Sequence, residues 1–260
     1  MFTKSDYEKL QQIMEESPEK KELLTRLLAS HQMTISSISH EIRNPLTLVY
    51  STIQLMESKH PQVTNIPYWS DLRNDIEYMK LLLEELSSYN NGEFLSLSTI
   101  DTDTFFKTLA LSFASSLIET DIQFVSNIES PLPLLSGDAV KLKEVFLNLL
   151  KNAREALDFT DSQTDRDSLS PTIHLSVTCE NRSCDFPSIL VTIKDNGCGI
   201  DDTKLPHIFE PFVTYKRNGT GLGLPLSARI IHAHHGSIHV SSVPGVHTTF
   251  TVSLPVQKNA

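Results

Sequence analysis

The amino-acid sequence predicts a chain of two parts, a helical hairpin followed by an α/β domain. The hairpin is indicated by two stretches with helical apolar spacing, which lie on either side of a breaker-rich loop from Ser58 to Pro67. The second part is indicated by mixed helix and strand patterns that begin after the polar turn at residues 89–93. We therefore predict three segments: an N-terminal helical or coiled-coil segment over residues 1–30, the hairpin over 31–91, and the α/β domain over 97–257.

The first stretch predicts a long helix. Residues 3–32 are charged and contain no glycine, and a break or cap is expected at Ser17-Pro18. An apolar stripe with alternating spacings of four and three continues into the following helix, which should end near Glu57. Its members are Leu24, Leu28, His31, Ile35, Ile38 and Ile42. The stripe fits either a buried amphipathic face or a coiled coil.

One histidine in this helix points away from the stripe. With Ile35 as zero and about 100° per residue, His40 falls at about 140° and Asn44 at about 180°. The apolar positions that stay within roughly 60° of Ile35 are Ile38, Ile42, Leu46, Val49 and Ile53. Glu41 lies beside the histidine, and Pro45 should bend the helix one turn later. An exposed histidine next to a carboxylate is a candidate nucleophile with its base, although most surface His-Glu pairs have no such role.

The second stretch predicts the other arm of the hairpin. Its apolar residues are spaced three, four, three, four and three apart: Trp69, Leu72, Ile76, Met79, Leu83 and Leu86. Two such helices joined by a short loop form an antiparallel pair. One hairpin cannot cover both stripes, so we expect either a homodimeric four-helix bundle or packing of the hairpin on its own C-terminal domain.

The second part predicts helices and strands in an order typical of an α/β layer. Asp138 is the expected N-cap of one helix, and the polar residues 158–170 are expected to form a loop. The last strand pair should turn at Val243-Pro244-Gly245. The expected helices are Asp103–Glu119 and Asp138–Asp158, and the expected strands are Ile122–Ile128, Thr172–Thr178, Ser188–Lys194, Ser237–Ser242 and His247–Leu254.

Two asparagines on the helix from Asp138 are candidate metal ligands. Asn148 and Asn152 are four residues apart and therefore lie together on one flank of the apolar stripe. Amide oxygens are suitable ligands for Mg²⁺, which keeps waters for phosphates. For an asparagine pair taken alone, capping of a neighbouring loop is the more common role.

The turn from Asp195 to Ile200 is a candidate ring-binding element because it follows a strand. The Asp195 carboxylate could accept a hydrogen bond from an exocyclic amine, and Gly197 and Gly199 would let a flat ring approach the backbone. The same residues also occur in plain turns without a ligand.

A glycine-rich loop further along is a candidate phosphate site. It comprises Gly219, Thr220, Gly221, Leu222 and Gly223, and it runs into a helix. Such a loop presents backbone N–H groups to phosphate. Pro225 in the first helical turn is tolerated, because its missing donor would have no partner there.

Only ten residues separate Phe209 from Gly219, and the resemblance of this segment to the F box of histidine kinases implies that it forms a short lid. Phe209 and Phe212 either anchor the lid or fill a core. Lys216 and Arg217 lie on the lid and could meet a terminal phosphate group as mobile cations.

The composition argues against several partners. A net charge of −10 disfavours nucleic acid or an anionic membrane. Cys179, Cys184 and Cys198 have neither metal-ligand spacing nor an even number, which fits a reducing cytosol. No apolar run is long enough to span a bilayer, so we expect a cytoplasmic protein without membrane insertion. We interpret the histidine cluster at residues 232–239 as a helix end and not as a metal site.

These segments, in this order, resemble the motifs of two-component sensor histidine kinases. The string SISHEIRNPLT resembles the phosphoacceptor box, NLLKNAREAL the N box, the turn at Asp195 the G1 box, IFEPF the F box and GTGLGL the G2 box. The resemblance covers about residues 30 to 254. It implies a dimerisation and histidine phosphotransfer hairpin, followed by an α/β sandwich ATP-binding domain of the gyrase, MutL and histidine kinase superfamily.

The resemblance implies ATP-dependent autophosphorylation of His40 and transfer of the phosphate to an aspartate on a response regulator receiver domain. Glu41 would take the imidazole proton, and Glu41 with Asn44 resembles a phosphatase motif. The implied partners are a second copy of the chain, the response regulator and a possible separate sensor protein. Two alternatives are a catalytically silent phosphorelay or scaffold protein of the same fold, and a non-kinase ATPase of the gyrase or MutL type.

The resemblance also implies the roles of the nucleotide-binding residues. Asn152 would hold Mg²⁺ with support from Asn148, and Asp195 would read the adenine amino group of ATP. Glu155 departs from the basic residue that many relatives carry there, which leaves open which cation meets the phosphates. The other implied residues are Gly197, Gly199, Phe209, Phe212, Lys216, Arg217, Gly219, Thr220, Gly221, Leu222 and Gly223.

Overall fold

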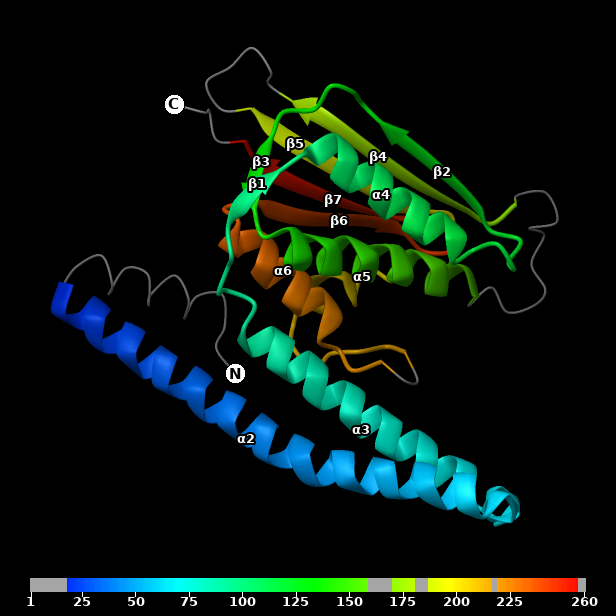
Figure 1. Cartoon of the computed structure of the whole chain (residues 1–260). Helices are drawn as coiled ribbons and strands as arrows, with labels where there is room; N and C mark the ends of the chain where they lie inside the picture. The colour runs from blue at the N-terminus through cyan, green and yellow to red at the C-terminus, as the bar shows by residue number, and fades with distance from the viewer. Residues whose placement is uncertain (1–17, 159–169, 181–186, 217–218, 257–260) are drawn as a thin grey trace. The chain divides into compact units, whose positions relative to one another are not determined.

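The computed structural model describes residues 18–158, 170–180, 187–216 and 219–256 (Figure 1). The chain divides into two compact units, and the division falls between Asn91 and Gly92. The first unit is helical, and the second combines helices with a mixed sheet. Within the described residues, no helix combines the length and apolar character needed to cross a membrane.

The first unit is an antiparallel helical hairpin. Helix α2 (Pro18–Lys59) is followed by the short 3₁₀ helix η1 (Pro61–Asn65) and by helix α3 (Trp69–Asn90). The expected break at Ser17-Pro18 corresponds to the first residue of α2, while residues 1–17 lie outside the described part. Helix α2 continues through Pro45, and its ribbon changes direction along its length in Figure 1.

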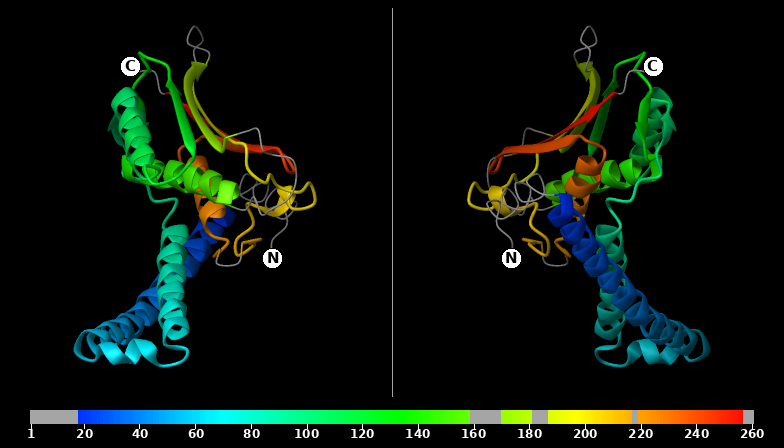
Figure 2. Two further views of the ribbon diagram at one scale, coloured as in Figure 1. Left: turned by 90° about the vertical axis from the view of Figure 1, so that its right-hand side faces the viewer. Right: turned by 90° about the vertical axis from the view of Figure 1, so that its left-hand side faces the viewer.

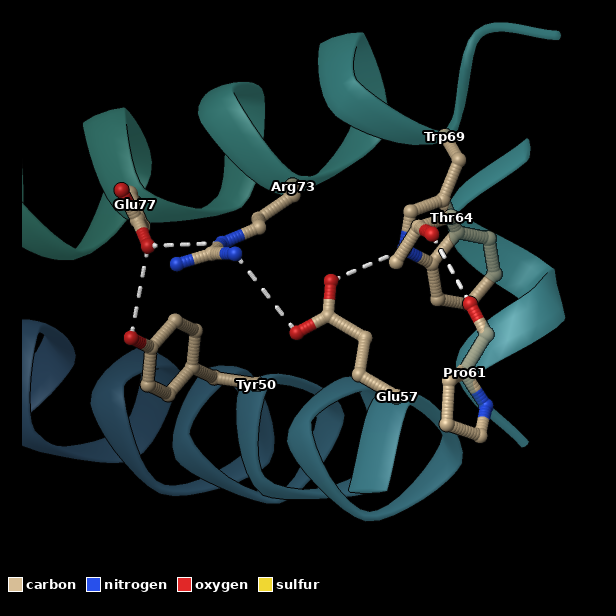
Figure 3. A network of polar contacts seen from close by, with 7 residues as sticks. All are labelled: Tyr50, Glu57, Pro61, Thr64, Trp69, Arg73 and Glu77. Atoms are coloured by element: carbon tan, nitrogen blue, oxygen red, sulfur yellow. Dashed lines mark hydrogen bonds and ion pairs between the residues drawn. The ribbon is translucent and has the colours of Figure 1, made fainter. Parts of the chain in front are cut away.

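A polar network joins the two helices near the loop (Figure 3). The indole Nε1 of Trp69 donates a hydrogen bond to Glu57 Oε1 at 2.9 Å, and Arg73 Nη1 lies 3.6 Å from Glu57 Oε2. Arg73 Nε also pairs with Glu77 Oε1 at 3.2 Å, and the Tyr50 hydroxyl donates to that oxygen at 3.4 Å. Glu57 therefore joins the end of α2 to the start of α3.

The hairpin leaves much of its apolar surface exposed. Ile53 of α2 and Ile76 of α3 are buried. Other members of the predicted stripes are exposed although they are apolar, namely Ile38, Ile42, Val49, Leu72 and Met79. This agrees with the expectation that one hairpin cannot cover both stripes.

The second unit contains the predicted helices and strands. Its helices are α4 (Thr102–Ser115), α5 (Ala139–Asp158) and α6 (Gly223–Ala233), with the 3₁₀ helix η2 (Leu205–His207). Its strands are β1 (Ser98–Ile100), β2 (Gln123–Ile128), β3 (Leu135–Gly137), β4 (Thr172–Glu180), β5 (Ser188–Asp195), β6 (Ser237–Val243) and β7 (His247–Pro255). The short strands β1 and β3, which form an antiparallel pair, were not predicted.

Helix α4 starts and ends earlier than predicted. Asp101, and not Asp103, caps it, because Asp101 Oδ1 accepts the backbone N–H of Thr104 at 3.3 Å. Asp103 instead accepts the backbone N–H of Leu132 at 2.9 Å. The helix ends at Ser115, whose hydroxyl bonds back to carbonyl oxygens of the preceding turn.

The five-stranded sheet has the order β2-β4-β5-β7-β6. Strands β2 and β4 pair in parallel, and the other neighbours pair antiparallel. Figures 1 and 2 show α4, α5 and α6 on one face of this sheet. Alternate residues of β4 and β5 are buried, as expected for a sheet with a helical layer on one face. The second unit is therefore a two-layer α/β sandwich.

The core lies between the sheet and α5. Phe146 of α5 is fully buried, and its ring centroid lies 5.1 Å from that of Phe106 of α4. The buried strand residues Ile173, Ile189 and Ile193 complete the same core. This packing holds α5 against the sheet, so the exposed flank of α5 has a defined orientation toward the loops around it.

Polar contacts attach the segment after Gly92 to the second unit. The backbone N–H of Ser96 donates to Asp138 Oδ2 at 2.9 Å, and Arg229 Nε pairs with Glu93 Oε1 at 3.0 Å. Asp138 also accepts the N–H groups of two residues in the first turn of α5, both at 3.1 Å, which confirms it as the N-cap.

Candidate functional site

The string SISHEIRNPLT lies within α2, where a helix was expected. The side chains of Glu41 and Asn44 are exposed, whereas the His40 side chain lies outside the described part. Arg43, between them, donates from Nη2 to the Leu83 carbonyl oxygen of α3 at 3.4 Å. The polar residues around His40 are therefore held on a helix that is itself attached to its neighbour.

Asn152 contacts a lysine from the lid. The Nζ atom of Lys216 donates to Asn152 Oδ1 at 2.7 Å and also pairs with the carboxylate of Glu155. Lys151, one turn before Glu155, lies 3.9 Å from the same carboxylate. Lysine–glutamate pairing on this helix surface was not predicted, although the acidic residue at position 155 was noted as unusual.

Asn148 is bonded to α6. Its Nδ2 donates to Ser227 Oγ at 2.9 Å, and that hydroxyl donates to the Gly223 carbonyl oxygen at 2.9 Å. Ser227 is buried and was missed by the sequence analysis, because a serine within an apolar helix has no motif signal. The Asn148 amide thus positions the glycine loop and α6 against α5.

Asp195 is the last residue of β5 and is only 2% exposed. Its Oδ1 accepts the backbone N–H of Gly197 at 2.9 Å. Burial raises the pKa of this carboxyl, and backbone hydrogen bonds from Gly197 and Thr248 oppose that shift. Thr248 is buried and faces Asp195 across the β5–β7 pair, which the sequence analysis did not predict.

The turn after Asp195 rests on the end of α5. The backbone N–H of Cys198 donates to the Ala156 carbonyl oxygen at 3.0 Å. Gly199 has a φ of +69°, a conformation that favours glycine. A Cβ at Gly197 would lie 2.6 Å from the Ala156 carbonyl oxygen, so Gly197 packs closely against the end of α5, the helix that carries Asn148 and Asn152. Gly199 instead packs against the turn at Val243 and Pro244.

The lid begins at a strained residue. Phe212 has a φ of +65°, and its backbone N–H donates to the Gly221 carbonyl oxygen at 2.9 Å. Its side chain is 60% exposed, whereas Phe209 is half-buried and Ile208 is buried. Within this segment, the backbone of Phe212 and the side chain of Ile208 supply the anchors, and the ring of Phe212 is left at the surface.

The glycine loop contacts the lid at its first residue and at its middle residue. The backbone N–H of Gly219 donates to the Lys216 carbonyl oxygen at 3.3 Å, while Arg217 lies outside the described residues. Gly221 has a φ of +70°, and a Cβ there would lie 2.6 Å from the carbonyl carbon of Phe212. A larger residue at Gly221 would therefore force the lid and the loop apart.

The end of the loop forms the start of α6. Leu222 is fully buried, so its side chain belongs to the core and only its backbone could meet a ligand. Its N–H lies 3.3 Å from Thr220 Oγ1. Helix α6 then begins at Gly223, with Pro225 in its first turn as predicted.

The donor set near α5 fits a hard divalent cation. Asn152 is half-buried, its side-chain oxygen accepts a hydrogen bond from Lys216 of the lid, and amide oxygens are accepted ligands of Mg²⁺. Among the described residues, no group of three His, Cys, Asp or Glu side chains could hold a metal. The asparagine oxygen is therefore the candidate ligand in this part of the structure.

Residues 137–258 match the family described as histidine kinase-, DNA gyrase B- and HSP90-like ATPases. The chain is 28% identical over 229 residues to the signal transduction histidine-protein kinase AtoS of Escherichia coli (strain K12), which covers 88% of this chain and 35% of AtoS. It is 32% identical over 262 residues to sporulation kinase A of Bacillus subtilis (strain 168), covering 95% of this chain and 39% of that kinase. The chain thus spans well under half the length of these two relatives.

A similar fold occurs in a solved structure, that of the histidine kinase ThkA in complex with the response regulator protein TrrA. It matches with a TM-score of 0.60 and 21% sequence identity, over 92% of this chain and 66% of that chain. This likeness shows that a helical hairpin followed by an α/β unit is a fold shared with that protein.

Proposed function

We propose that this chain is a two-component sensor histidine kinase that transfers the γ-phosphoryl group of ATP to His40 and then to a response regulator. The observation that carries the proposal is the gathering of three motifs along α5. Asn148 bonds to the helix after the glycine loop, Asn152 bonds to the lid, and the Ala156 carbonyl accepts a hydrogen bond from the turn after Asp195. Three segments distant in the sequence thus meet along one helix, which supports a single nucleotide site there.

The residues of this site have complementary roles toward ATP. The Asp195 carboxylate would accept the adenine amino group, and the flanking turn would lie against the ring. Backbone N–H groups of the glycine loop would hold the phosphates at the start of α6. Asn152 would hold Mg²⁺, which neutralises phosphate charge when bound. Lys216 and Arg217 would supply further positive charge from the lid.

The proposed reaction transfers the phosphoryl group of ATP first to His40 and then to an aspartate of the receiver domain. The Nε2 atom of His40 would form a bond to the γ-phosphorus while the bond from that phosphorus to the β-bridging oxygen breaks and ADP leaves. Glu41, the exposed carboxylate next in the chain, would take the imidazole proton. The phosphoryl group would then pass to an aspartate of the receiver domain. In the phosphatase reaction, the exposed Asn44 amide would position water against the phosphoaspartate of the receiver domain, and inorganic phosphate would leave.

The proposal assigns a task to each part of the chain. Residues 31–91 would form the dimerisation and phosphotransfer hairpin, residues 97–257 the catalytic domain, and residues 1–30 an input segment. The exposed apolar residues of the hairpin support a homodimer, in which a second copy would cover them. A receiver domain is the proposed substrate, and a separate sensor protein is a possible source of input.

Labelling with γ-phosphate-labelled ATP and Mg²⁺ tests the proposal. The native chain should acquire an acid-labile, alkali-stable label, and both His40→Gln and Asn152→Ala should lack it. His239→Gln, which changes an exposed histidine on β6, should be labelled like the native chain. Label that survives His40→Gln would exclude His40 as the nucleophile. ATP binding without any label on the native chain would favour a catalytically silent protein of the same fold.

A further inference from the structure

We propose that Glu155 is a positioning residue that holds the ammonium group of Lys216 on the Asn152 oxygen, so that Lys216 and Mg²⁺ compete for this oxygen. The inference rests on the proposed function in one respect, the assignment of Asn152 as the metal ligand. It gives a role to Glu155, the acidic residue that departs from the kinase motif.

Two acceptors on α5 hold the lysine together. Lys216 Nζ donates to Asn152 Oδ1 at 2.7 Å and pairs with the Glu155 carboxylate. Residues three apart on a helix project to the same side, so Asn152 and Glu155 form a single acceptor site. The Lys216 and Glu155 side chains are only 36% and 32% exposed, so this ion pair is partly shielded from water.

The backbone of the lid supports this placement. The Lys216 N–H donates to Thr214 Oγ1 at 3.2 Å, and its carbonyl oxygen accepts the N–H of Gly219 at 3.3 Å. The lysine therefore lies in a local turn with defined partners on each side. Its side chain reaches α5 across a separation of 61 positions in the sequence from Glu155.

The same oxygen cannot serve both cations fully. A lone pair of Asn152 Oδ1 that accepts the ammonium N–H is not available to a metal ion along the same direction. The ammonium group is thus an internal substitute for a divalent cation at this amide. Binding of Mg²⁺ with nucleotide would displace it, and the released Lys216 could then contact phosphate.

Lys151 completes the arrangement. It lies 3.9 Å from the Glu155 carboxylate, one turn back on α5, but is held by the same helix and not by the lid. When Lys216 leaves, Lys151 remains beside Glu155. The carboxylate would then repel the phosphates less than an isolated negative charge, in a chain whose net charge is already −10.

The test measures how much Mg²⁺ strengthens ADP binding to the 260-residue chain. The dissociation constant of ADP is measured by calorimetry in EDTA and in excess Mg²⁺, and the ratio of the two is compared between variants. A substitution that changes charge also changes the affinity for ADP directly, but this effect is similar in EDTA and in Mg²⁺ and therefore largely cancels in the ratio. Lys216→Met should raise this ratio about fivefold to tenfold, because the competitor is lost. Glu155→Gln should raise it in the same direction.

Two further variants make the test specific. The double variant Lys216→Met/Glu155→Gln should show nearly the same ratio as Lys216→Met alone, because both substitutions act on one interaction. Lys151→Met removes the other lysine beside the Glu155 carboxylate. Because Lys151 is not the cation held on Asn152, this variant should not raise the ratio. Thermal unfolding of each variant checks that the fold is retained.

The possible failures are distinguishable. If Lys216→Met and Glu155→Gln leave the ratio unchanged or lower it, the competition does not exist, even if the native chain is labelled on His40. If Lys151→Met raises the ratio equally, general electrostatics and not positioning is responsible, and the proposal is overturned. If the native chain binds ADP with the expected ratios but is not labelled by ATP, the kinase function fails while the positioning role stands.

Discussion

The Nε2 atom of His234, just after α6, lies 2.9 Å from the backbone nitrogen of Asp138, the N-cap of α5. The other ring nitrogen, Nδ1, lies 2.8 Å from the Ile230 carbonyl oxygen. Because Nε2 must accept the Asp138 N–H, the ring is neutral and carries its proton on Nδ1. A buried imidazole therefore joins the helix after the glycine loop to the helix that carries the two asparagines.

Acid should weaken this connection. Burial lowers the pKa of His234, while the Ile230 carbonyl and the nearby Asp138 carboxylate oppose that shift. The unfolded chain then binds the proton first, so the free energy of unfolding should fall as the pH drops below about 6.5 and level off below the folded pKa. Denaturant unfolding at several pH values measures this slope.

His234→Gln should remove the part of this pH dependence that comes from the imidazole. It should also lower the free energy of unfolding at neutral pH by about 1–3 kcal/mol, the usual cost of leaving a buried donor unpaired. His239→Gln, at an exposed site on β6, is the control and should keep the native slope. Equal slopes for the native chain and His234→Gln would contradict the assignment.

Asp195→Asn should separate nucleotide affinity from stability. Burial raises the pKa of Asp195, so the folded chain binds its proton more tightly than the unfolded chain. Stability is therefore lost as the pH rises from about 4 through the folded pKa, and it remains lost at neutral pH. Asparagine keeps the Oδ1 acceptor for Gly197 without the charge, so the free energy of unfolding at pH 7 should not fall.

The same variant should bind adenine nucleotides about 10- to 100-fold more weakly, the equivalent of one charged hydrogen bond. Calorimetric titration with ADP and thermal unfolding provide the two measurements. Asp201→Asn, an exposed carboxylate in the following loop, should match the native chain in affinity. Unchanged ADP affinity in Asp195→Asn would exclude Asp195 from adenine recognition.

Two adjacent residues of α2 test the dimer. Val49 lies on the predicted apolar stripe and is 47% exposed, whereas its neighbour Leu48 is 70% exposed and lies about 140° from the centre of the stripe. Val49→Glu should raise the dimer dissociation constant more than tenfold, because it would bury a charge in the interface. Leu48→Glu should change it little. Sedimentation at several concentrations distinguishes the two, and equal effects would place the interface elsewhere.

Glu57→Ala should loosen the tip of the hairpin. It removes the acceptor of the Trp69 indole N–H and a partner of Arg73 (Figure 3). The expected loss is about 1 kcal/mol, since the ion pair is near the surface and the hydrogen bond is half-buried. The chain has one tryptophan, so its fluorescence reports this site directly. Glu84→Ala on the exposed side of α3 should leave both the emission and the stability unchanged.

The sequence predicted the elements that carry a clear period. The striped helices and the strands from β4 to β7 were found within one or two residues at most ends, because burial of one face imposes spacing on the chain. The pair β1 and β3 was missed, since three-residue strands contain too few positions to show a period. The parallel pairing of β2 with β4 was also not predicted, because local pattern does not encode which strands become neighbours.

The motifs predicted which residues gather in the second unit but not how they bond. The contact of Asn148 with Ser227 joins positions 79 apart, and that of Asn152 with Lys216 joins positions 64 apart. Such pairs depend on how α5, α6 and the lid pack. The motif also suggested a ligand role for Leu222, whose side chain the fold places in the core.

The contacts of α5 at Asn148, Asn152 and Ala156 recur every fourth residue. At about 1.5 Å of rise per residue they are about 6 Å apart, and each is rotated only about 40° from the last. The spacing of these contacts along α5 therefore sets the distances between the glycine loop, the lid and the turn after Asp195. One inserted residue between the asparagines would turn the remaining contacts by about 100°. Other surface residues of α5 can therefore change without moving these segments, but the number of residues between the three contact positions cannot change.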